Sequence, residues 1–137
     1  MKKLVILCLS LLLAGCTLSS DKTLDNILNK FENDNIELVK KTSKVNFYKG
    51  DKCSLNYIHE LNSPIALNIS YLDKRDKKTC IKSSKALINK LDENNKKLYD
   101  KVVQKNKAKF KYNDTKGYII CDKKSILIVF NDKLYKK

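Results

Sequence analysis

The sequence has few of the residues from which catalytic, metal and nucleotide sites are usually built. It contains one histidine, His59, and three glycines among 137 residues. Gly50 and Gly117, which follow the N-terminal segment, both fall in expected turns, so no glycine-rich phosphate loop is indicated. The five cysteines include no Cys-x-x-Cys pair, and one histidine is too few for a zinc site. The sequence therefore predicts no cofactor, no metal site and no catalytic residue.

His59 finds no partner for nucleophilic catalysis. Cys53 falls on the same face of the same predicted strand, but six residues at about 3.3 Å each place the two side chains about 20 Å apart. Cys80 or Cys121 could reach His59 only through the fold, and the acids are scattered among lysines without an indicated pair. We expect His59 at the rim of a hairpin turn.

Arginine is almost absent although the chain is strongly basic. Twenty-nine basic residues face 15 acids, a formal net charge of +14, yet Arg75 is the one arginine. Phosphate and base recognition favours the planar arginine fork. Residues 107–112 alternate lysines with aromatics, but in a strand these two sets point to opposite faces, so one nucleic-acid strand cannot contact both. We expect no nucleic-acid partner and a solvated lysine-rich surface, with anionic lipid headgroups or envelope polymers as the alternative neighbours.

The first twenty residues carry the most specific signal. Two lysines precede an apolar run over residues 4–13, which is too short to cross a bilayer, and the run ends in Leu13-Ala14-Gly15-Cys16. This segment resembles the lipobox of bacterial prolipoproteins. The resemblance implies that Cys16 is lipidated and that a lipoprotein signal peptidase cuts before it. An ordinary secretory signal with an incidental cysteine is the alternative.

The resemblance also implies a location and an organisation. The mature protein would be held by its lipid in the cell envelope, outside the cytoplasm, and in a host with two membranes Thr17 resembles the default outer-membrane sorting residue. We expect a signal peptide over residues 1–15, a lipid anchor and tether over 16–22, and a single domain over 23–137. Removing residues 1–15 leaves 122 residues with a formal charge of +12, enough for one hydrophobic core.

Hydrophobic periodicity predicts an α+β domain: a mostly antiparallel sheet with an N-terminal helix and one long central helix packed on one face. The N-terminal helix is expected over residues 20–33. The central helix begins at Thr79 and continues to about Val102, with 92–95 as a position for a kink. In the turn over 49–52, Gly50 is expected to supply a positive φ. Strands are expected over 36–40, 44–49, 53–60, 65–71, 107–112, 118–121 and 125–130.

Three cysteines remain in the domain, and an exported compartment favours a disulfide over free thiols. If Glu60 lies opposite Ile65, Cys53 lies at the end of the hairpin where its second strand leaves the sheet. The long helix must start near that end, and this brings Cys80 close to Cys53. That helix and the next two strands would leave Cys121 at the opposite end. We therefore predict a Cys53–Cys80 disulfide, in preference to the other pairings and the reduced form, with a stabilisation of about 3 kcal/mol. Cys121 is expected to be a buried thiol, with an intermolecular bridge as its alternative role.

These features predict a lipid-anchored cell-envelope protein that acts as a non-catalytic binding or interaction module. Its expected partners are the membrane, through the anchor, and an envelope protein or an anionic polymer; the oligomeric state is not indicated. The alternative function is an envelope hydrolase with a dispersed active site. An exposed apolar patch would favour the binding module, and a deep pocket that joins His59 to a carboxylate or a cysteine would favour the hydrolase.

Overall fold

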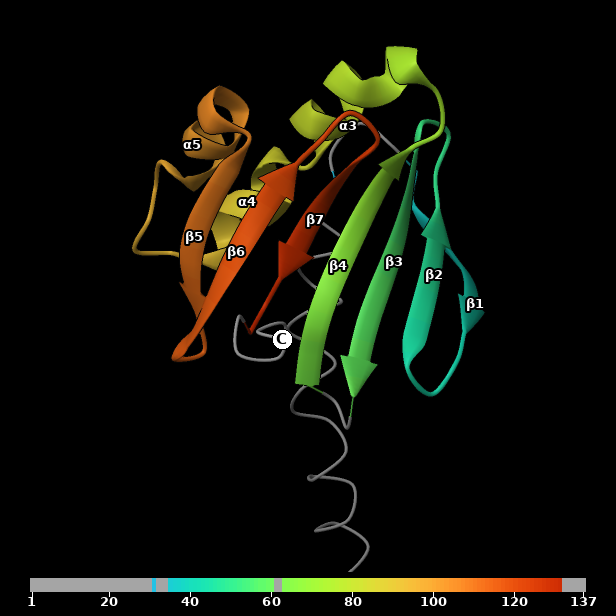
Figure 1. Cartoon of the computed structure of the whole chain (residues 1–137). Helices are drawn as coiled ribbons and strands as arrows, with labels where there is room; N and C mark the ends of the chain where they lie inside the picture. The colour runs from blue at the N-terminus through green and yellow to red at the C-terminus, as the bar shows by residue number, and fades with distance from the viewer. Residues whose placement is uncertain (1–30, 32–34, 61–62, 132–137) are drawn as a thin grey trace, which may run out of the picture.

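The computed structural model of the chain describes residues 31, 35–60 and 63–131 (Figure 1). These residues form a seven-stranded sheet in the order β1-β2-β3-β4-β7-β6-β5, with every neighbouring pair antiparallel. The strands are β1 (Glu37–Lys41), β2 (Val45–Lys49), β3 (Cys53–Glu60), β4 (Ser63–Tyr71), β5 (Lys107–Tyr112), β6 (Thr115–Cys121) and β7 (Ser125–Val129). A 3₁₀ turn, η1 (Lys74–Asp76), precedes three short helices: α3 (Lys77–Ser83), α4 (Lys85–Leu91) and α5 (Leu98–Lys105).

The predicted architecture with one long central helix is wrong, because two side chains interrupt it. The Ser84 hydroxyl donates a hydrogen bond to the Ile81 carbonyl (2.7 Å), a side-chain bond that competes with regular helix, and α3 ends just before Ser84 while α4 begins just after it. After Leu91, Asp92 adopts an extended backbone (φ −140°, ψ 94°). Its carboxylate accepts the backbone N–H groups of Asn94 (3.2 Å) and Lys111 (3.0 Å), so the chain leaves the helix there.

This interruption reverses the chain and changes where the last strands lie. After α5, the Asn106 carbonyl accepts the backbone N–H of Cys121 (2.8 Å). Tyr71 donates its backbone N–H to the Lys124 carbonyl (3.1 Å), and its hydroxyl lies 3.5 Å from the Cys121 Sγ. Cys121 therefore lies at the same end of the sheet as Cys53, which pairs with Tyr71. The prediction that Cys121 lies at the opposite end is wrong, since it assumed an unbroken helix.

The β3–β4 hairpin is confirmed, with a different register from the predicted one. Cys53 pairs with Tyr71, and the pairing shifts between Ile58 and His59. Glu60 then pairs with Ser63. A shift of this kind adds a residue to one strand and bends it, and no period-2 pattern reveals it.

The β5–β6 turn uses asparagine and aspartate, and not glycine, for its left-handed residues. Asn113 and Asp114 have φ values of 45° and 63°, and they form the two-residue loop of the β5–β6 hairpin. No glycine in the described ranges has a positive φ, so the prediction for Gly50 is wrong. Gly117 lies inside β6, where a Cβ atom would come within 2.6 Å of the Phe110 ring.

The hydrophobic core lies between the helices and one face of the sheet. The three helices lie behind the sheet in Figure 1, and α3, α4 and α5 contact β4, β5 and β6. The predicted N-terminal helix lies outside the described residues apart from Phe31, which is buried in this core. No helix in the described part of the chain is long and apolar enough to cross a membrane. Fully buried core side chains include Leu55, Leu67, Ile69, Leu87, Ile88, Leu98, Val102, Ile119, Ile126 and Ile128.

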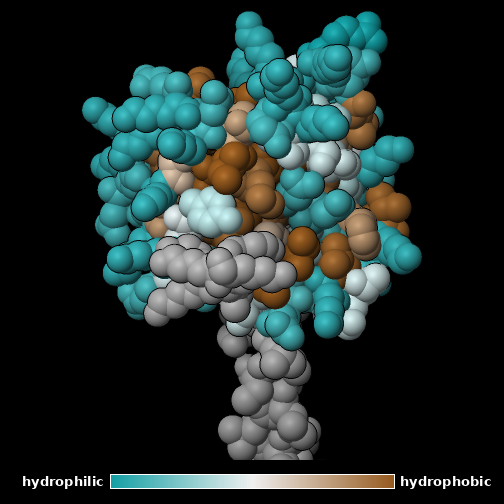
Figure 2. Space-filling model, in the orientation of Figure 1, coloured by the Kyte–Doolittle hydropathy of each residue, from teal (hydrophilic) through white to brown (hydrophobic). Residues whose placement is uncertain are grey.

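The opposite face of the sheet carries an apolar patch. Figure 2 views this face and shows hydrophobic side chains in its centre with hydrophilic ones around them. Strand pairing places Ile58, Ala66, Val129 and Tyr118 in one row across this face, with Val129 buried. Ile120 lies beside Leu127 in the next row on the same face. Ile120 is 43% exposed.

Candidate binding site: a lysine-rimmed pocket

Five lysines with helical spacing form one side of a pocket on the outside of the helical layer. They are Lys74, Lys77, Lys78, Lys82 and Lys85, which occupy positions i, i+3, i+4, i+8 and i+11 of one helical face through η1, α3 and the start of α4. Ile81 lies among them and is half-buried. Arg75 completes the charged rim.

Asp73 fixes the start of this charged segment. Its carboxylate accepts the backbone N–H of Arg75 (3.0 Å) and pairs with the Arg75 guanidinium (3.3 Å). Both donors stabilise the charged carboxylate and so lower the pKa of Asp73 below its ordinary value. The backbone N–H has the larger effect and the Arg75 side chain the smaller one. The aspartate therefore caps η1 and orients the segment that carries the lysines.

Helix α5 supplies the rest of the pocket floor. Tyr99 and Val103 are one turn apart and face the pocket together with Ile81. The Lys85 Nζ lies 5.7 Å from the centroid of the Tyr99 ring, a cation–π contact. Val103 is 49% exposed, so much of this apolar floor is open to solvent. The pocket has a volume of about 630 Å³ and is called the lysine-rimmed pocket below.

The charge of the lysine-rimmed pocket is of one sign. Among the described residues its lining has six cations and no carboxylate. Three ion pairs shorter than 4 Å join described residues, and none of them uses one of the five pocket lysines. Burial, followed by the nearby charge of Asp100, raises the pKa of Tyr99, so the phenol stays neutral. The pocket thus combines a positive rim with a neutral, mostly apolar floor, which suits an anion that carries an apolar group.

The predicted disulfide is confirmed. Cys53 and Cys80 are bonded, with their Cα atoms 5.9 Å apart, and both side chains are fully buried. Cys121 is a free, buried thiol, as predicted, and its neighbour is the Tyr71 hydroxyl. Burial of Tyr71 is the main cause of its raised pKa, and Cys121 raises it further. Cys16, the predicted lipidation site, lies outside the described residues.

His59 is held by neutral neighbours. Its Nε2 lies 3.3 Å from the Asn46 Oδ1, and its ring stacks on Tyr57 with 5.1 Å between centroids. Cys53 is part of a disulfide and offers no thiolate to a histidine. No group of three or more His, Cys, Asp or Glu side chains in the described ranges has a metal-binding arrangement.

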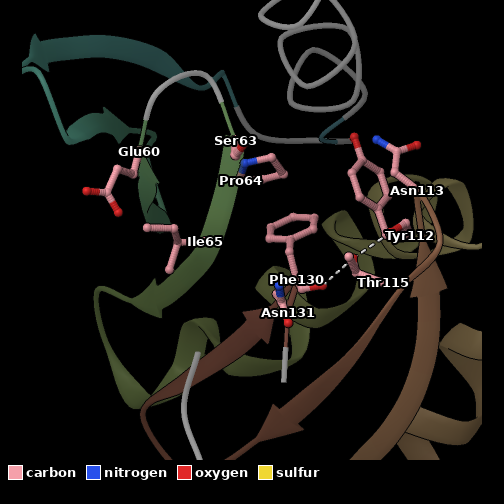
Figure 3. Close-up of a pocket in the computed structure, with 9 residues that line it drawn as sticks. All are labelled: Glu60, Ser63, Pro64, Ile65, Tyr112, Asn113, Thr115, Phe130 and Asn131. Carbon is pink, nitrogen blue, oxygen red and sulfur yellow. Dashed lines mark hydrogen bonds between the residues drawn. The ribbon is translucent and has the colours of Figure 1, made fainter. Parts of the chain in front are cut away.

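A second cavity of about 410 Å³ lies at the end of the sheet opposite the Cys53–Tyr71 pair (Figure 3). The Thr115 hydroxyl contacts the carbonyl oxygens of Tyr112 (2.7 Å) and Phe130 (3.0 Å), and burial raises the pKa of Tyr112. Glu60 is the one carboxylate among the lining residues described, and in Figure 3 it points away from the Phe130 ring. His59 lines neither this cavity nor the lysine-rimmed pocket. The cavity thus joins His59 to neither a carboxylate nor a cysteine.

The lysine-rimmed pocket was not predicted from the sequence. The lysines were expected to form a solvated surface. The available signal was the spacing of the lysines around Ile81, which continues through α3 and into α4. The partner side chains Tyr99 and Val103 come from a separate helix, and no local pattern joins them to α3. The sequence matches no protein-family model, and no curated protein and no solved structure is significantly similar to it.

Proposed function

We propose that this protein is a lipid-anchored cell-envelope protein that works as a non-catalytic binding module, with the lysine-rimmed pocket as the site for an anionic partner. The anchoring rests on the lipobox-like segment that ends at Cys16. The binding function rests on one observation: six cations surround an exposed apolar floor that contains no carboxylate from the described residues.

The chemistry of this lining favours binding over a hydrolase. Hydrolysis needs a nucleophile or a water that is activated by a base, and then a group that stabilises the developing charge. The pocket offers cations and one phenol whose raised pKa keeps it protonated. Such groups attract and hold an anion through the charge on the rim, while the apolar floor holds its uncharged part.

The test compares two double charge reversals that change the net charge equally. In the purified protein, Lys78→Glu with Lys82→Glu alters the pocket, whereas Lys107→Glu with Lys109→Glu alters exposed positions on the edge strand β5. The ligand is the membrane fraction that co-purifies with the wild-type protein from its own cells. Each basic residue near an anionic surface contributes about 1 kcal/mol, so the pocket variant should bind this fraction at least about tenfold more weakly than the wild type. The β5 variant should retain most of the binding. Equal losses in both variants would reject the pocket as the binding site.

The anchor is tested separately. Cys16→Ala should leave an unlipidated product that no longer partitions into the detergent phase. Intact-mass measurement of a mature protein with an unmodified Cys16 would reject the anchored form without affecting the pocket.

A further inference from the structure

We infer that the anionic partner of the lysine-rimmed pocket is a membrane lipid with an anionic headgroup, so that the domain lies on the bilayer through this face. This inference rests on the proposed function and names the partner of the same site. It starts from the arrangement of charge around the apolar floor. The cations follow the outer side of η1, α3 and α4, and Ile81, Tyr99 and Val103 are exposed or half-buried among them. Peripheral helices that lie in the membrane interface have this combination of basic and apolar side chains.

The excess of lysine over arginine on the rim favours a lipid surface over a partner that presents one rigid carboxylate. Five of the six are lysines, which act as mobile point charges and lack the planar fork that recognises one carboxylate or phosphate in one geometry. Arg75, the exception, is already paired with Asp73. Lysine can lay its aliphatic stem along an apolar surface and extend its ammonium group to a headgroup. Such a rim matches many similar, mobile headgroups better than a single rigid anion.

The exposure of the site favours a partner that supplies its own apolar surroundings. Ligand pockets for small molecules usually enclose most of the ligand. Here Val103 on the floor is 49% exposed, and every cation of the rim except Lys77 is exposed. A lipid needs no such enclosure, because its acyl chains remain in the bilayer while Val103 and Ile81 contact them. Tyr99 presents a ring and a hydroxyl together, as aromatic side chains at membrane interfaces do.

The anchor makes a weak lipid site sufficient. A lipid on Cys16 would keep the domain beside the bilayer, and the effective concentration of headgroups at the pocket would be high. The pocket then decides which face of the domain meets the membrane. The apolar patch around Ile120 lies on the opposite face of the sheet from the helices and would remain directed to other partners.

The experiment uses a reporter that the chain itself lacks. The sequence contains no tryptophan, so Val103→Trp and Ile120→Trp each create a single fluorophore at a comparably exposed apolar position, 49% and 43% exposed. The full-length lipidated protein is inserted in vesicles of pure phosphatidylcholine or of equal parts phosphatidylcholine and phosphatidylglycerol. We expect the Val103→Trp emission to move to shorter wavelength, and to be quenched by brominated acyl chains, in the anionic vesicles only. The Ile120→Trp emission should stay unchanged in both.

The other outcomes of this experiment either support the inference or overturn it. Lys78→Glu with Lys82→Glu in the Val103→Trp protein should abolish the shift, and retention of the shift would overturn the inference. Equal shifts at both reporters would also overturn it, since the membrane contact would then not involve this face in particular. If soluble polyglutamate moves the Val103→Trp emission and phosphatidylglycerol does not, the partner is an acidic polypeptide: the lipid inference fails and the proposed function stands. If neither anion moves it, both fail. Should Val103→Trp lose its cooperative urea transition, Tyr99→Trp places the reporter on the same floor and leaves all the rim lysines in place.

Discussion

Replacing both Cys53 and Cys80 with alanine should lower the free energy of unfolding by about 3.5 kcal/mol. The two cysteines are 27 positions apart, and their bond closes a loop that contains the β3–β4 hairpin and the start of the helical layer. In the chain-entropy model the bond restricts the unfolded chain, and a loop of this length accounts for the stated value at 25 °C. For a domain of this size, the loss corresponds to a decrease in melting temperature of roughly 10–15 °C.

The assay is urea unfolding of the purified wild-type and variant proteins, with and without a thiol reductant. Reductant should lower the stability of the wild type by a similar amount and leave the double variant unchanged. Cys121→Ala is the matched control, because Cys121 is buried but unbonded. It should cost about 1 kcal/mol through its contact with Tyr71 and keep the full response to reductant. A loss below about 1 kcal/mol in the double variant would refute the entropic reasoning, and a reductant response that survives in it would refute the pairing.

Two further predictions concern the last three strands. Gly117→Ala should destabilise the protein by about 1–3 kcal/mol in urea unfolding, because the new Cβ overlaps the Phe110 ring and the backbone of β7; Gly50→Ala, at a position without positive φ, should stay within about 0.5 kcal/mol of the wild type. Asp122 accepts two backbone N–H groups in the β6–β7 turn, those of Lys124 and Ser125, which lower its pKa. A lowered pKa in the folded state stabilises above the unfolded value of 3.8, and this contribution is lost as the pH falls through the folded pKa. Asp122→Asn should therefore be less stable than the wild type by about 0.5–1 kcal/mol at pH 7, a small value because the turn is exposed, and the difference should shrink as the pH falls below 3.8; a difference that does not change with pH would contradict this origin.

The strands of this protein could be predicted from the sequence because their signal is local. Alternation in residues 53–60 and 107–112 marks which side chains enter the core, and β3 and β5 have this burial pattern. The expectation of an exported compartment, together with the expected proximity in the hairpin, also led to the correct Cys53–Cys80 pairing. The pairing was correct although the predicted position of Cys121 was wrong. The length of the helix affected only the position of Cys121, because Cys80 lies near the start of the helix.

The sequence by itself thus determined the strands, the sign and excess of charge, and the cysteine pairing. Only the tertiary structure decided where the helix ends and what the lysines surround. An apolar stripe continues past residues 92–95, and the bond that fixes the break at Asp92 comes from Lys111, 19 residues later in another element. The reversal that follows places Cys121 beside Tyr71 and brings Val103 into the lining of the same pocket as the lysines of α3. Periodicity records which side of a helix is apolar, but a pocket between two helices depends on their packing, which is set by contacts between residues far apart in the chain.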